Sequence, residues 1–128
     1  MRIKKRKPKK IAPEYIFIFD DISTDLKSPD VSKLVKQNRH YKSKVIISSQ
    51  YPLDIQPQSR RQIDYWLLFA GHDKEKLEKI YHDADLNIDF DLFLKIYHEA
   101  TEIKYHFLYI DTNNSEFRKD FNFKFSFT

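Results

Sequence analysis

The chain contains no cysteine, only one glycine and no long apolar run. The absence of cysteine excludes disulfides and thiolate metal sites, and it fits a reducing compartment. A membrane-spanning helix needs about 18 consecutive apolar residues, and no segment approaches that length. The N-terminus also lacks the apolar stretch of a signal peptide. We therefore expect no membrane span and a protein that stays inside a cell or a particle.

What is present is sufficient for a folded core. Of the 128 residues, 41% are hydrophobic and 16% are aromatic, which is typical of one globular domain or part of one. The formal net charge of +4 arises in the first ten residues, which carry seven lysines and arginines. We expect a flexible basic head over residues 1–13 and a folded segment over residues 14–128.

The basic head has three interpretations. The segment from Lys4 to Lys10 resembles a nuclear localisation signal. It is equally suited to bind nucleic-acid phosphates without sequence preference. It is also consistent with a solvated charged tail, or with a loop of a longer protein.

Short apolar runs alternate with helical patterns along the rest of the chain, which predicts an α/β fold with a mostly parallel sheet. The first run, Tyr15–Phe19, is apolar enough for a strand buried on both faces. The tail from Phe121 alternates phenylalanines with polar residues, as expected for a half-exposed strand with its phenylalanines in the core. The expected strands are 15–19, 44–49, 65–70, 105–110 and 121–128, and the expected helices are 28–40, 58–63, 73–82 and 90–100.

Polar side chains follow two of the expected strands. Asp20 and Asp21 directly follow the first strand, and Gln50 follows the second. In parallel sheets the ligand crevice lies at the carboxyl ends of the strands. Two acids at such a position suit a magnesium-nucleotide site, in which one carboxylate holds the metal and the other orients or deprotonates the attacking water. The alternative is that the acids only cap a helix or belong to a solvated turn.

Several ordered motifs together resemble the DNA-packaging ATPases of nucleocytoplasmic large DNA viruses, a branch of the FtsK-HerA superfamily of P-loop motors. The similarity covers roughly residues 14–125 and includes the later helices and the run YHFLYID. The matching motifs are the Walker B run ending in Asp20 and Asp21, the run Asn38, Arg39, His40 and Tyr41, the strand end at Gln50, Tyr51, Pro52 and Leu53, then Arg60, and the run Ile63, Asp64 and Tyr65.

The resemblance implies a role for each matching residue. Asp20 would hold Mg²⁺, Asp21 would activate the water, and Gln50 would sense the γ-phosphate, with ATP as the nucleotide. Arg60 would be the better candidate for an arginine finger that reaches a neighbouring subunit, and Arg39 the weaker one. The alternative for both arginines is a surface charge or a salt bridge.

One departure from the family pattern is severe. A P-loop reads G-x-x-x-x-G-K-[ST], and the only glycine here, Gly71, is followed by His72 and Asp73. The resemblance implies a three-layer sandwich with strand order 5-1-4-3-2, in which the P-loop strand lies between strands 44–49 and 65–70. Without it, we expect these two strands to pair directly, to stay partly disordered, or to borrow a strand from a partner.

The leading hypothesis is that the chain is the C-terminal portion of such an ATPase, inactive alone. The resemblance then implies double-stranded DNA, a homo-oligomeric ring and a capsid or portal protein as partners, in host cytoplasm, a virion or the nucleus. The competing hypotheses are a non-catalytic remnant that binds DNA or assembles with a full-length ATPase, and an unrelated small α/β binding protein. The five histidines have no zinc-site spacing.

Overall fold

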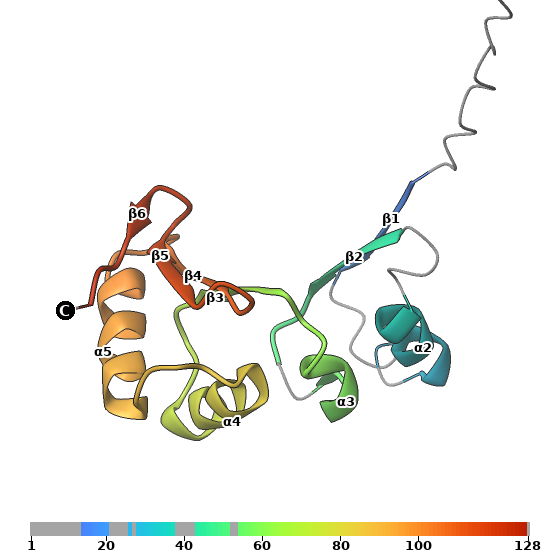
Figure 1. Cartoon of the computed structure of the whole chain (residues 1–128), viewed down its shortest axis with the longest axis horizontal. Coiled ribbons are helices and arrows are strands. Elements are labelled where there is room, and N and C mark those ends of the chain that lie inside the picture. The colour runs from blue at the N-terminus through green and yellow to red at the C-terminus, as the bar shows by residue number, and fades with distance from the viewer. Residues whose placement is uncertain (1–13, 21–25, 27, 38–42, 52–53, 128) are drawn as a thin grey trace, which may run out of the picture.

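The computed structural model describes residues 14–20, 26, 28–37, 43–51 and 54–127 (Figure 1). The basic head, Asp21 and Arg39 lie outside the described residues, and so do the predictions made for them. The chain has an α/β fold, as the sequence pattern predicts, with two separate sheets.

The first sheet has two parallel strands, β1 (Tyr15–Asp20) and β2 (Ser43–Ser48), paired in register from Tyr15 opposite Ser43 to Asp20 opposite Ser48. Helix α2 (Pro29–Gln37) connects them. The hydroxyl of Ser28 accepts a hydrogen bond from the Asp30 N–H at 3.2 Å and so caps the start of this helix.

The second sheet has four antiparallel strands in the order β3 (Tyr65–Phe69), β4 (Phe107–Asp111), β5 (Glu116–Lys119) and β6 (Phe123–Lys124). A short helix, α3 (Pro57–Arg60), precedes β3. Helices α4 (Lys74–Ala84) and α5 (Phe90–Thr101) connect β3 to β4, and each begins at an aspartate whose side chain accepts a backbone N–H.

The main core lies between the second sheet and helices α4 and α5. Alternate residues of β3 and β4 face these helices, because successive side chains of a strand point to opposite faces. The buried residues of this cluster are Trp66, Leu68, Leu77, Ile80, Phe93, Ile96, Tyr97, Ala100, Leu108, Ile110 and Phe117.

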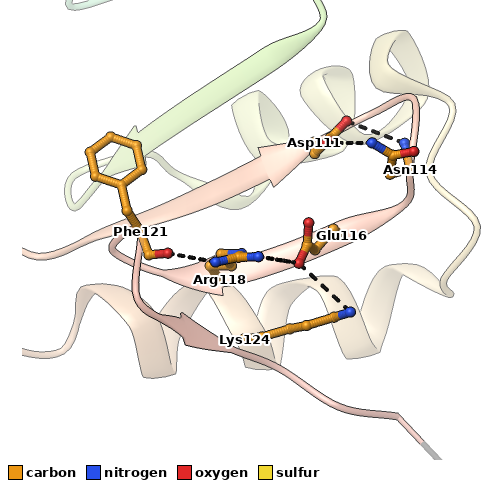
Figure 2. A network of polar contacts seen from close by, with 6 residues as sticks. All are labelled: Asp111, Asn114, Glu116, Arg118, Phe121 and Lys124. Atoms are coloured by element: carbon orange, nitrogen blue, oxygen red, sulfur yellow. Dashed lines mark hydrogen bonds and ion pairs between the residues drawn. The ribbon is translucent and has the colours of Figure 1, made fainter.

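Polar contacts hold the β4–β5–β6 meander in register (Figure 2). The buried carboxylate of Asp111 accepts hydrogen bonds from the backbone and the side-chain amide of Asn114, which close the turn into β5. Glu116 pairs with Arg118 at 2.6 Å and with Lys124 at 3.6 Å. Arg118 also donates to the carbonyl of Phe121 at 2.8 Å, so one guanidinium ties β5 to the turn before β6.

Three details of the expected fold are wrong. The sheet that contains β3 is antiparallel rather than mostly parallel. Helices α4 and α5 bring the chain back to the carboxyl end of β3, so β4 starts there and runs antiparallel to β3. Strand β1 is largely exposed rather than buried on both faces. Residues 121–128 are not one strand, since only Phe123–Lys124 pairs with β5, and Phe121, Phe123 and Phe127 are exposed.

An ion pair joins the start of β4 to the turn before β6. The Asp120 carboxylate lies 2.6 Å from Nδ1 of His106 and accepts the Phe107 N–H at 3.2 Å. The hydrogen bond from His106 lowers the pKa of the Asp120 carboxyl, and the Phe107 N–H lowers it further.

This shift makes stability depend on pH. A carboxyl whose pKa is lowered by folding adds stability above its unfolded pKa, about 4, and that stability disappears as the pH falls through the lower folded value. We expect Asp120→Asn to destabilise the chain at pH 6 and to have a smaller effect at pH 3, as measured by urea unfolding. Asparagine tolerates the positive φ of 53° at this position, so an equal loss at both pH values would contradict the role of the charge.

Candidate functional site

The carboxyl ends of β1 and β2 lie side by side. Asp20 is the last residue of β1 and pairs in register with Ser48, the last residue of β2. Gln50 follows two residues later, and both Asp20 and Gln50 are exposed. The structure thus places the predicted metal ligand and the predicted sensor at the same edge, whereas Asp21 lies outside the described residues.

The segment after β2 is folded back on itself. The Ser49 hydroxyl accepts the Tyr51 N–H at 3.2 Å and donates to the Tyr51 carbonyl at 3.0 Å. The Lys76 ammonium of α4 lies 5.3 Å from the centre of the Tyr51 ring. These contacts anchor the residues on either side of Gln50 to the rest of the fold.

A cleft of about 560 Å³ separates the two sheets. Its walls are residues 45–49 of β2 and the segment after it, and residues 65–69 of β3, with Val35 of α2 and Ile55 also lining it. Strands β2 and β3 belong to different sheets and do not pair with each other. Of the three outcomes expected for the missing strand, direct pairing of β2 and β3 is therefore not what the structure contains.

Two buried polar atoms have no hydrogen-bond partner within the described part of the chain. They are the indole N–H of Trp66 and the hydroxyl of Ser59. Trp66 is one of the residues that line the cleft. Buried groups of this kind cost free energy unless they are paired.

His72 also lines the cleft, and the sequence patterns assign it no role. Gly71, at φ 107°, turns the chain after β3. The His72 N–H then donates to the Tyr97 hydroxyl at 3.2 Å, which itself donates to the Phe69 carbonyl at 2.7 Å. Burial lowers the pKa of His72, and the nearby Lys76 lowers it further, so the imidazole is neutral at pH 7. The sequence signal that could have identified His72 is its position directly after Gly71, the only glycine.

Arg60 is held inside the protein. Its Nε donates to the Asp83 carboxylate at 2.6 Å and its Nη1 to the Ile55 carbonyl at 2.8 Å. The side chains of Arg60 and Asp83 are only 10% and 13% exposed. The guanidinium therefore links α3 and the segment before it to α4, and it would have to leave Asp83 to reach another subunit. Arg39 lies outside the described residues.

The described residues include no group of three or more histidine, aspartate or glutamate side chains suited to bind a metal ion. A magnesium ion that is shared with nucleotide phosphates needs only one or two protein carboxylates. The exposed Asp20, at a strand end beside Gln50, fits that requirement.

No helix in the described ranges is long and apolar enough to cross a membrane.

Solved structures of viral genome-packaging NTPases share this fold. Genome packaging NTPase B204 from Sulfolobus turreted icosahedral virus 2, in complex with ATP-gammaS, superposes with a TM-score of 0.60 at 23% identity. Its AMPPCP complex gives 0.65 at 21%. B204 of Sulfolobus turreted icosahedral virus, a DNA-packaging ATPase, gives 0.62 at 21%.

These matches cover 82% of this chain but only 50% to 53% of the three solved chains, so the chain spans about half their length. Among curated proteins, the uncharacterized protein L437 of Acanthamoeba polyphaga mimivirus is 27% identical over 84 residues. That alignment covers 62% of this chain and 30% of L437. No family model matches the sequence. The chain therefore has the fold of part of a viral genome-packaging NTPase.

Proposed function

We propose that this chain is the C-terminal portion of a viral DNA-packaging ATPase of the FtsK-HerA type. The observation that carries the proposal is the cleft between β2 and β3, which occurs in a chain that spans about half of the packaging NTPase structures it resembles. A strand inserted there would pair with the free edges of both sheets, and its following loop would lie at the carboxyl ends of β1 and β2. This is where a P-loop would complete the site.

In the completed site each residue has a distinct task. Mg²⁺-bound ATP would supply the phosphoryl group that is transferred to water. Asp20 would bind the metal, Asp21 would accept the proton of the attacking water, and Gln50 would hydrogen-bond that water or the γ-phosphate. Arg60 would have to leave its ion pair with Asp83 to act as an arginine finger, and Arg39 is the other candidate.

The partners follow from this function. The complete enzyme would form a homo-oligomeric ring on double-stranded DNA. It would couple ATP hydrolysis to translocation of the DNA into a capsid, with a capsid or portal protein as its partner there. We place it in the host cytoplasm or the virion, with the nucleus accessible through the basic segment Lys4 to Lys10.

The test is reconstitution. The reading frames immediately upstream of this chain are searched for a strand followed by G-x-x-x-x-G-K-[ST], and the encoded polypeptide is co-expressed with the chain. We expect a stable complex that hydrolyses ATP only when Mg²⁺ is present. Neither polypeptide should hydrolyse ATP by itself. The absence of such a polypeptide, or an inactive complex, would favour the second candidate, a non-catalytic remnant that binds DNA through its basic head.

A further inference from the structure

The second sheet has one covered face and one open face. Trp66 and Leu68 of β3 face α4 and α5 in the core, together with their cross-strand partners Ile110 and Leu108. The intervening residues of β3 and β4 must therefore point to the opposite face. Figure 1 shows helices α2, α3 and α4 together on one side of the strands.

The open face is strongly aromatic. We define the outer face as the six residues that lie opposite the core: Tyr65, Leu67, Phe69, Phe107, Tyr109 and Phe121.

The rings of the outer face contact one another. Tyr65 stacks on Tyr109 at 6.0 Å, and Phe69 packs against Phe107 at 5.2 Å. Phe121 bridges to Phe107 at 5.1 Å and to Tyr109 at 5.5 Å. Phe69 and Phe121 are still about half exposed, at 48% and 55%. A continuous apolar patch of this kind on a soluble protein marks an interaction surface.

The first sheet is also incompletely covered. Ile16, Ile18 and Ile46 are among its most exposed apolar residues, and the register places Ile18 directly opposite Ile46 on one face. Strands that are apolar on both faces are stable when both faces are covered. The described helices therefore leave much of this sheet uncovered.

The outer face is continuous with the cleft. Tyr65, Leu67 and Phe69 belong to the outer face and also line the cleft beside the free edge of β3. A polypeptide that enters the cleft as a strand therefore leaves it next to the outer face. The packaging NTPase structures contain about as much chain again as this chain matches, which is enough for further elements there.

The charges around the outer face argue against nucleic acid as the occupant. Arg118 lies on the same face as Tyr109, its cross-strand partner, but it is paired with Glu116. The Asp111 carboxylate lies on this face opposite Tyr65. A platform for single-stranded nucleic acid combines stacking rings with positive charge that is free for phosphates. Lys124, the cross-strand partner of Arg118, is also paired with Glu116, so these two cations already have a carboxylate partner.

We propose that the outer face is the docking surface for an amphipathic helix of the polypeptide that completes this domain. A helix is the suitable occupant because it satisfies its own backbone hydrogen bonds and buries one apolar stripe against a sheet. The inference rests on the proposed function and adds the second layer, which insertion of a strand alone does not require.

The first measurement is footprinting of the reconstituted complex. Hydroxyl-radical oxidation of Tyr65, Tyr109 and Phe121, and amide exchange of β2 and β3, are compared in the free chain and in the complex. We expect both signals to fall severalfold. Protected strand amides with unchanged oxidation would overturn the helix inference while leaving the proposed function intact. If neither signal changes, or no complex forms, the proposed function fails and the inference fails with it.

A pair of matched variants tests the same surface by affinity. Phe121→Asn removes a ring of the outer face, whereas Phe127→Asn removes an exposed ring that packs on the core residue Phe117 instead. We expect Phe121→Asn to raise the dissociation constant of the complex about tenfold or more. The dissociation constant of Phe127→Asn should be close to that of the unmodified chain. Equal effects of the two variants would contradict the inference. If oxidation of the outer face falls as the concentration of the free chain rises, the face binds a second copy of this chain, and the inference is overturned.

Discussion

Replacing Asp21 with asparagine in the reconstituted enzyme should lower kcat by about 10² to 10⁴, the usual contribution of a general base. Asparagine keeps the size of the side chain but cannot accept the proton of the attacking water. ATP binding should persist, because the metal is assigned to Asp20 and the phosphates to the P-loop of the added polypeptide. The measurement is a steady-state ATPase assay with a separate determination of nucleotide affinity.

The neighbouring acid provides the control. Asp25 lies four residues after Asp21 and has no role in the proposed site, so Asp25→Asn should leave kcat unchanged. Loss of nucleotide binding in Asp21→Asn would indicate that Asp21 binds the metal. Unchanged ATP hydrolysis in Asp21→Asn would show that Asp21 has no catalytic role.

Replacing Arg60 with alanine should destabilise the isolated chain by about 3 to 5 kcal/mol, the cost of leaving one partner of a buried ion pair uncompensated. The Asp83 carboxylate would keep its burial but lose its ion-pair partner, and the Ile55 carbonyl would lose a donor. Urea unfolding measures the loss without any nucleotide or partner. A role limited to an arginine finger predicts no change in this experiment.

Two further variants separate charge from packing. Arg61 is the adjacent arginine and is exposed, so Arg61→Ala should change stability by a few tenths of a kcal/mol at most. The double variant Arg60→Met with Asp83→Leu removes both charges and fills similar space, so it should regain much of the stability lost in Arg60→Ala. If the double variant is as unstable as Arg60→Ala, the packing of the long side chain rather than the uncompensated charge explains the loss.

Local patterns predicted most helices and strands to within a few residues. Asp73 and Asp89 stand before periodic apolar runs, and both cap helices as acidic N-caps do. The strand 65–70 was predicted from its apolar run, and β3 occupies Tyr65–Phe69. Such features depend on neighbours within a few positions, so they can be read along the chain.

Strand β5 and the tail were not predicted correctly, for opposite reasons. Glu116–Lys119 has a single apolar residue, Phe117, and it is a strand because the turn closed by Asp111 brings it beside β4. The phenylalanines after residue 120 alternate well, but Asp120 at positive φ and the contact of Phe121 with β4 rings direct the chain differently. In both cases a contact distant in sequence outweighs the local pattern.

The sequence by itself determined the α/β class, the strand that ends in Asp20 and the position of Gln50 after the next strand, because these depend on short-range hydrophobic patterns. The tertiary structure alone decided that β3 starts a separate antiparallel sheet, that a cleft lies between β2 and β3, and that Arg60 is buried against Asp83. The physical reason is that strand pairing, cavities and the burial of charge depend on residues far apart in the chain. No local pattern records which of those residues come into contact.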